Sequence, residues 1–228
     1  MKVHFVEAHA TVKIKLPKPV IKKLPDRVCI ATDVQFIKHL PSLKNQLEAA
    51  GKTAATVKGA HARHISQILG CSHLKMDYPK LTEAFLYVGD GLFHPKALLL
   101  GSDKDVYIYN PFSKEFRKLP HSEVAEIKKQ EKAAMTRFLH ADKVGVLLSV
   151  KPGQTGVQAY LNQIYSLEKT FPEKRFHYLA FDTLDFNQLE NFTFVDVFVN
   201  TACTRLMDDC ARFPKPVVNI EQILNLKK

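Results

Sequence analysis

Hydrophobic and polar positions follow two kinds of repeat along this chain. Short, almost continuous apolar runs are typical of buried strands, and longer segments with apolar residues every three or four positions are typical of helices. The predicted strands cover residues 27–32, 53–57, 84–88, 106–109, 143–150, 176–181 and 195–199. The predicted helices cover residues 35–50, 120–139, 156–170, 185–191 and 221–226, and a further helix opens at residue 94. Because strands and helices alternate, the pattern predicts an α/β fold with mainly parallel sheets in two Rossmann-like units.

The same pattern divides the chain into three parts. Residues 18–118 and residues 119–228 are each long enough to form one α/β domain. Residues 1–17 alternate apolar residues with lysines, as at Val12, Ile14 and Leu16, which predicts an extended strand or linker. We expect the edge of such a strand to bind another chain, because unpaired strand edges recruit partners.

Composition is typical of a globular protein of the cytoplasm. The chain has 228 residues, of which 46% are hydrophobic and 25% are charged. No apolar run approaches the ~20 residues of a membrane span, so no membrane partner is expected. The first residues lack the basic and then apolar layout of a signal peptide. The four cysteines include no Cys-x-x-Cys pair, which excludes a zinc ribbon or finger, and in a reducing compartment they stay thiols.

The charge of the chain favours an acidic partner only weakly. The net charge is +10 and the isoelectric point is near 9.4. The lysines are scattered, with modest clusters at residues 13–23 and 128–132, and no RNA-binding signature is present. A basic α/β protein that binds nucleic acid is therefore the least favoured hypothesis, and a solvated basic surface explains the same residues.

The most informative stretch follows the last predicted long strand. This strand ends just before Cys203, which is followed by Arg205, Asp208, Asp209 and a second thiol at Cys210. Ligands of open α/β sheets bind at the carboxyl ends of strands, so a thiol in that place beside charged side chains indicates a site. The alternative is a buried structural cysteine before an ordinary helix start, since free cysteines are commonly buried.

Three further motifs lie at predicted strand or segment ends. They are the Gly-Cys pair at residues 70–71, the Gly-Asp-Gly turn with His-Pro at residues 89–95, and Lys-Pro-Gly-Gln at residues 151–154. Together with Ala-Cys-Thr-Arg at residues 202–205 and the two aspartates that follow, these motifs resemble those of the diphthamide synthase family, in the same order. The resemblance covers nearly the whole chain, but only the middle and last of the three domains of that family.

The resemblance implies a metal centre and a reaction. In the family, three similar α/β domains each supply one cysteine to a 4Fe–4S cluster. Cys71 and Cys203 match two of these ligands, and the third would belong to a first domain of which residues 1–17 are a remnant. The implied reaction transfers a 3-amino-3-carboxypropyl group from S-adenosylmethionine to a histidine of translation elongation factor 2, the protein substrate. A homodimer or a hetero-complex would supply the missing domain.

The resemblance also assigns residues to the S-adenosylmethionine site. Gly89 and Gly91 would allow close approach of the backbone, and the helix after them would offer its first N–H groups to a carboxylate. His94 would contact the ligand or simply open the helix beside Pro95.

The other residues of this site would lie in the second unit. Lys151 and Gln154 would form hydrogen bonds to polar groups of S-adenosylmethionine. Arg205 and Asp208 would hold its carboxylate and its ammonium group, whereas Asp209 would equally suit the first turn of a helix.

Cys210 and Cys29 are the alternative thiols. Cys210 lies seven positions after Cys203, about 10.5 Å along a helix, so both could bind one cluster only if the helix starts late. Cys29 lies inside a predicted strand and is expected to be buried. Packing explains both thiols without a metal.

Two functions of different class follow from these motifs. Arg205, Asp208 and Gln154 favour a ligand-binding enzyme, a 3-amino-3-carboxypropyl transferase that works with a partner chain. The incomplete set of cluster cysteines favours a non-catalytic partner or scaffold subunit of an intact synthase.

Overall fold

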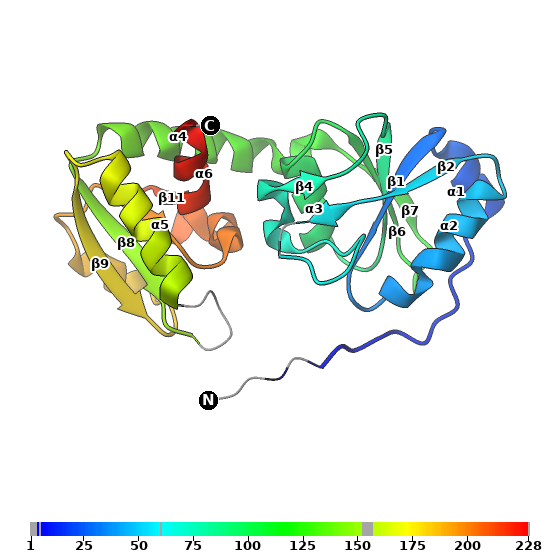
Figure 1. Ribbon diagram of the computed structural model, residues 1–228, viewed down its shortest axis with the longest axis horizontal. Coiled ribbons are helices and arrows are strands. Elements are labelled where there is room, and N and C mark those ends of the chain that lie inside the picture. Colours follow the sequence, from blue (N-terminus) through cyan, green and yellow to red (C-terminus); the bar gives the residue numbers. More distant parts are fainter. Residues whose placement is uncertain (1–3, 5, 60, 152–156, 228) are drawn as a thin grey trace. The chain divides into compact units, whose positions relative to one another are not determined.

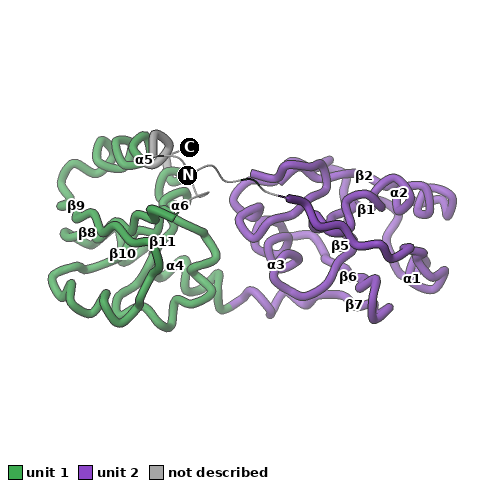
Figure 2. The backbone as a smooth tube through the Cα atoms, turned by 90° about the horizontal axis from the view of Figure 1, so that it is seen from below, with its two compact units in different colours: residues 1–4, 126–228 green, residues 5–125 purple. Residues whose placement is uncertain are grey.

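The computed structural model describes residues 4, 6–59, 61–151 and 157–227. Its backbone forms two compact units, one that ends at Ala125 and one that begins at Glu126 (Figure 2). Each unit is built on a sheet of mainly parallel strands with helices packed on it (Figure 1). The predicted fold class, α/β with mainly parallel sheets, is confirmed.

The first unit contains a five-stranded sheet. Its strands lie in the order β2 (Thr53–Thr56), β1 (Arg27–Thr32), β5 (Ala84–Val88), β6 (Asp105–Tyr109) and β7 (Phe116–Leu119). Neighbouring strands are parallel except β7, which runs antiparallel to β6. The sequence pattern missed β7, because its residues FRKL contain two cations and only Leu119 is buried.

Alternate side chains of β1 pack into two hydrophobic clusters, one on each face of this sheet. Val28 and Ile30 lie in the cluster that includes residues of α2 (Leu40–Glu48). Cys29 and Ala31 lie in the cluster that includes residues of α3 (Phe93–Leu100). Successive side chains of a strand point to opposite faces, so a strand that is covered on both faces is apolar throughout.

The remaining elements of the first unit are short. They are α1 (Lys18–Lys23), the 3-10 helices η1 (Ile37–His39), η2 (Gly70–Leu74) and η3 (His121–Val124), and the antiparallel pair β3 (Lys58–Gly59) and β4 (Met76–Asp77). The helix predicted over residues 35–50 is divided into η1 and α2. Pro41 lies in the first turn of α2, a position that suits proline because no backbone N–H is needed there.

The strand predicted within residues 1–17 is not formed in the part that the structure describes, residues 4 and 6–17. Leu16 instead donates its backbone N–H to Oε1 of Gln46 in α2 at 2.8 Å, and Nε2 of Gln46 donates to the carbonyl of Ile14 at 3.0 Å. Ile14 and Leu16 are buried in the cluster that contains α2 residues. The alternation therefore reflects packing on a helix rather than pairing in a sheet, and the expected unpaired strand edge is wrong for these residues.

The second unit contains a four-stranded sheet in which all neighbours are parallel. Its order is β11 (Val217–Asn219), β10 (Val197–Asn200), β8 (Lys143–Ser149) and β9 (Arg175–Phe181). The helices are α4 (Ala125–His140), α5 (Val157–Thr170), η4 (Phe186–Asn191), η5 (Thr204–Arg212), α6 (Ile220–Leu224) and η6 (Asn225–Lys227). The segment after Cys203 is thus a 3-10 helix, with a kink at Asp209, rather than the ordinary helix considered above.

The longest helix in the described ranges, α4, has 16 residues and a polar exposed side. No helix there is long and apolar enough to cross a lipid bilayer.

Candidate functional site

Several loops gather at the carboxyl edge of the first sheet. Gly89 follows β5 and donates its N–H to the carbonyl of Tyr109, the last residue of β6, at 3.1 Å. Thr32, the last residue of β1, pairs with Gln67 in an isolated parallel bridge. The loop that leads to Cys71 therefore lies at the same edge of the sheet as the glycine turn.

The backbone of this loop is bound to β1 like an additional strand. Thr32 donates its N–H to the carbonyl of Ser66, and Ile68 donates its N–H to the carbonyl of Thr32, both at 2.8 Å. Ser66 also donates its N–H to the carbonyl of Val57 at 2.7 Å. Ser66 and Ile68 are fully buried, so the approach to Cys71 is part of the core.

Cys71 itself is half-buried in η2 and is not part of a disulfide. The next residue, Ser72, closes the turn: its hydroxyl accepts a hydrogen bond from the N–H of Leu69 at 2.9 Å. Gly59 of β3 packs against this hydroxyl so closely that an added Cβ would lie 2.4 Å from it. Packing of the serine against a glycine therefore sets the position of the turn that carries Cys71.

The glycine turn after β5 is shaped by a buried tyrosine. A Cβ on Gly89 would lie 2.6 Å from the hydroxyl of Tyr87, so only glycine fits there. Gly91 has a φ of 70°, in the region that favours glycine. The hydroxyl of Tyr87 donates to Oδ2 of Asp33 at 3.2 Å, and burial raises the pKa of Tyr87.

A hollow of about 150 Å³ lies beside this turn. Asp90 shapes it, because its Oδ1 accepts from the N–H of Gly91 and from Nδ2 of Asn110, both at 2.8 Å. Its lining comes from the turn and from β6 and β7: Gly89, Asp90, Gly91, Leu92, Ile108, Asn110, Glu115 and Arg117. His94 is the second residue of α3 and its ring stacks edge-on against that of Phe93. Asn110 and Arg117 were not predicted from the sequence, since they follow or lie in strands without a motif.

The loop that carries Cys203 is held by two buried asparagines at the carboxyl edge of the second sheet. Nδ2 of Asn200 lies 2.9 Å from the carbonyl of Cys203 and 2.8 Å from Oδ1 of Asn219, to both of which it donates. Oδ1 of Asn200 accepts from the N–H of Ala202 at 2.9 Å. Asn219 in turn donates to the carbonyl of Thr204 at 3.2 Å. Cys203 is exposed at the start of η5 and is not part of a disulfide.

Arg205 and Asp208 are joined in a tight ion pair on η5. Nε of Arg205 donates to both carboxylate oxygens of Asp208, at 3.0 and 2.9 Å, and Nη2 donates to Oδ2. The side chain of Arg205 is only 5% exposed and that of Asp208 is 33% exposed. The pair therefore fixes the guanidinium two residues after Cys203. Asp209 forms a looser, exposed pair with Arg212 at 3.9 Å.

Lys151 lies just beyond the carboxyl end of β8, next to the strand that precedes Cys203. Its side chain is exposed, and its backbone N–H donates to Oγ of Ser149 at 3.3 Å. Gln154, the other residue predicted for this side of the site, lies outside the described residues.

The other two thiols have different surroundings. Cys29 is completely buried in β1, and burial raises its pKa to about 12. The thiol of Cys210 donates to Oε1 of Gln130 in α4 at 2.6 Å, and burial raises its pKa as well. Cys210 lines a cavity of about 540 Å³ between α4 and the segment after η5, and Cys203 does not line it.

The predicted residues are thus grouped within each unit. Gly89 and Gly91 lie in the turn after β5, His94 lies in the first turn of α3 just beyond it, and Cys71 lies in η2 after the loop that pairs with β1. Lys151, Cys203, Arg205 and Asp208 follow strands at one edge of the second sheet. Within the described ranges no three His, Cys, Asp or Glu side chains form a group that could hold a metal ion.

This fold and these loops define a class of protein: two Rossmann-like α/β units, each with a thiol on a loop at the carboxyl edge of its sheet. The family model described as "Putative diphthamide synthesis protein" matches residues 1–225. The chain belongs to this family.

Several synthases to which this chain is similar are considerably longer than it. The chain is 28% identical to 2-(3-amino-3-carboxypropyl)histidine synthase of Pyrococcus horikoshii, over 91% of this chain and 60% of that protein. It is 31% identical to the protein of the same name from Methanocaldococcus jannaschii, over 81% of this chain and 56% of that protein. A crystal structure of Dph2 from Pyrococcus horikoshii with a 4Fe-4S cluster is similar with a TM-score of 0.67 and 27% identity, over 90% of this chain and 59% of that one. The chain thus spans 60% or less of the length of these relatives.

Proposed function

We propose that this chain is part of a diphthamide synthase in which Cys71 and Cys203 bind a 4Fe–4S cluster. The reaction would transfer a 3-amino-3-carboxypropyl group from S-adenosylmethionine to a histidine of translation elongation factor 2. The observation that carries the proposal is the placement of the two cysteines on loops at the carboxyl edges of parallel sheets, where open α/β sheets bind ligands. The names of the relatives and the 4Fe-4S cluster of one solved relative support it.

The two thiols suit an iron–sulfur cluster chemically. Such clusters are held by cysteine thiolates, and neither Cys71 nor Cys203 is in a disulfide. Cys203 is exposed and Cys71 is half-buried, whereas Cys29 is enclosed in the sheet. When bound and reduced, the cluster supplies the electron that breaks a carbon–sulfur bond of S-adenosylmethionine. Because all four cysteines lack disulfides, we also propose a reducing, cytoplasmic location.

The remaining residues of the chain would bind and orient S-adenosylmethionine. In the turn at residues 89–91 only Asp90 has a side chain, so the ligand can approach the backbone. Helix α3 begins just after this turn and has His94 in its first turn. Arg205 and Asp208 are charges of opposite sign, which suits the carboxylate and the ammonium of the methionine part.

Lys151 would form a hydrogen bond to the ligand at the edge of the second sheet. We propose the same role for Gln154.

A cluster of this kind needs more ligands than these two thiolates. Cys210 is unsuited, because its thiol is bound to Gln130 and burial raises its pKa. Cys29 is unsuited because it is completely buried. We therefore propose that a further thiolate comes from outside these two units, from a partner chain in a homodimer or a hetero-complex or from another part of a longer protein.

A transfer assay tests the proposed function. The chain is purified anaerobically, reconstituted with iron and sulfide, and reduced with dithionite. It is then incubated with elongation factor 2 and S-adenosylmethionine labelled in the aminocarboxypropyl group, with and without a candidate partner. We expect label on a histidine of the factor, and we expect Cys71→Ala and Cys203→Ala to abolish it. Transfer that survives both substitutions would contradict the proposal and identify the chain as a non-catalytic subunit.

Binding of S-adenosylmethionine tests the role of Arg205 separately. Arg205→Ala should weaken binding by ~1–3 kcal/mol, because charge-assisted hydrogen bonds to the ligand carboxylate are lost. Calorimetry on the reconstituted protein measures this loss. Arg212→Ala is the matched control, since Arg212 is an exposed arginine of the same helix. Equal affinities of the wild type and Arg205→Ala would remove Arg205 from the site.

A further inference from the structure

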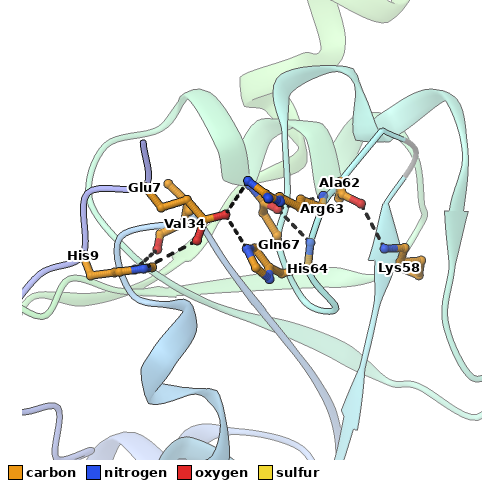
Figure 3. Close-up of polar contacts among 8 residues, drawn as sticks. All are labelled: Glu7, His9, Val34, Lys58, Ala62, Arg63, His64 and Gln67. Carbon is orange, nitrogen blue, oxygen red and sulfur yellow. Dashed lines mark hydrogen bonds and ion pairs between the residues drawn. The ribbon is translucent and has the colours of Figure 1, made fainter. Parts of the chain in front are cut away.

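Glu7 lies at the centre of a polar cluster between the N-terminal segment and the loop that leads to Cys71 (Figure 3). Its Oε1 lies 2.7 Å from Nε2 of His64 and 3.3 Å from Nη1 of Arg63. Its Oε2 lies 3.5 Å from Nε2 of His9. The hydrogen bond from His64 lowers the pKa of Glu7, so the carboxylate is charged at neutral pH. One carboxylate thus contacts two residues of the loop and one of its own segment.

The N-terminal segment is itself anchored at the end of β1. Nδ1 of His9 donates to the carbonyl of Val34 at 3.0 Å, and Ala10 donates its N–H to the carbonyl of Gln35 at 2.9 Å. Val34 and Gln35 follow β1 almost directly. Residues 7–10 therefore connect the loop after β1 with the loop before η2, two segments at the same edge of the sheet.

Gln67 links the residues that Glu7 contacts to the part of the loop nearest Cys71. Its Oε1 accepts hydrogen bonds from the backbone N–H groups of both Arg63 and His64, each at 3.0 Å. Its backbone pairs with Thr32 of β1. The loop residues that Glu7 holds are thus bonded directly to the residue four positions before Cys71.

The loop needs such support, because part of its backbone is strained. His61 has a φ of 60° and Ser66 a φ of 64°, both in the left-handed region that side chains disfavour. Conformations of this kind persist only where the surroundings hold them. The side chains of Glu7 and His64 are 25% and 34% exposed, so their contact is shielded in part from water.

We infer that Glu7 is a positioning residue for Cys71. It gathers Arg63 and His64, and through Gln67 it keeps the strained loop in the conformation that presents the thiol. The importance of presenting Cys71 rests on the proposed function, but the mechanical link from Glu7 to the loop does not.

Hydrogen exchange of the cluster-free protein tests the link. In Glu7→Ala, peptides covering residues 66–72 should exchange about tenfold faster, because the loop opens more often. Peptides of β5 should exchange as in the wild type. His64→Ala removes one of the three contacts of Glu7, so it should accelerate exchange in the same segment but by less. The double variant should exchange no faster than Glu7→Ala, since that variant already lacks the contact between the two side chains. Glu83→Ala, which removes an exposed carboxylate paired with Arg27 at 2.6 Å in the same unit, is the control and should leave residues 66–72 unchanged.

Two results would overturn the inference. The first is unchanged exchange at residues 66–72 in Glu7→Ala. The second is exchange that rises as much in β5 as at residues 66–72, which would show a general loss of stability. In the reconstituted protein, Glu7→Ala should also lose iron to a chelator several-fold faster than Glu83→Ala. If no cluster forms in the wild type even with a partner that supplies the further thiolate, the proposed function fails while the exchange result still stands.

Discussion

The two loops that carry Cys71 and Cys203 are held by different means. The Cys203 loop is fixed from within its own sheet, by Asn200 and Asn219 at the ends of neighbouring strands, both completely buried. The Cys71 loop is bound to β1 through its backbone and is then supported by Glu7, 57 positions from His64 in the sequence and partly exposed.

Because of this difference, the stability of the Cys203 loop should depend closely on that of its sheet, and the stability of the Cys71 loop should depend on its sheet less closely. Buried amides that bond to the backbone cost much free energy when one of them is removed, because their partners remain buried and unsatisfied. Surface contacts from a distant segment are worth less and can open while the sheet stays folded. We therefore expect the Cys203 loop to be as stable as its sheet and the Cys71 loop to open locally.

The largest expected effect is a difference in the rate of alkylation between thiols. Cys29, the buried thiol in β1, is the reference with which the two loop thiols are compared. Burial raises the pKa of Cys29 from 9.0 to about 12, so at pH 8 it has about a thousandfold less thiolate than an ordinary cysteine, and the thiolate is the reactive form. Iodoacetamide followed by mass spectrometry should label Cys203 and leave Cys29 unmodified in the folded protein. Labelling of Cys29 as fast as Cys203 would contradict its burial.

The same pKa shift has a consequence for stability. Below pH 9 the thiol of Cys29 is protonated in both states and contributes no pH dependence. As the pH rises from 9 toward 12, the unfolded state loses this proton and the folded state keeps it, so the free energy of unfolding should fall.

Removal of a buried asparagine should give the next largest effect. Asn200→Ala deletes the hydrogen bonds to Cys203, Ala202 and Asn219 and should lower the free energy of unfolding by ~2–3 kcal/mol. Urea unfolding followed by circular dichroism measures it. Asn187→Ala, an exposed asparagine of the same unit, should cost less than ~0.5 kcal/mol. Equal losses in the two variants would show that the buried network does not stabilise the second unit.

The matching change in the Cys71 loop should have the smallest effect. Ser72→Ala removes the acceptor for the N–H of Leu69 and should cost about 1 kcal/mol in the same urea experiment. Ser122→Ala, at an exposed serine of the same unit, should be close to neutral. A loss for Ser72→Ala that exceeds that of Asn200→Ala would reverse the comparison between the two loops.

The apolar pattern was sufficient to predict most of the strands and the place of both loop thiols. Runs such as those ending at Thr32 and Asn200 are buried on both faces, and the loop that carries Cys203 follows the second of them. The same pattern misled at residues 12–16, because alternation is produced equally well by an extended segment packed on a helix.

The supporting residues could not be predicted in this way. Asn219 lies 19 positions from Asn200, and Glu7 lies 57 positions from His64. Single polar residues carry no periodicity, and only the folded sheet shows that their side chains meet. The 3-10 geometry of η5 depends likewise on tertiary contacts that propensity does not encode.

Iron, sulfide and electron paramagnetic resonance measurements on anaerobically reconstituted protein test the central proposal most directly. The variants are Cys71→Ala, Cys203→Ala, Cys29→Ser and Cys210→Ser, each measured with the partner that gives the wild type its full cluster. We predict that the first two lose the 4Fe–4S signal and that the last two keep it. A complete cluster in Cys71→Ala or Cys203→Ala would contradict the account.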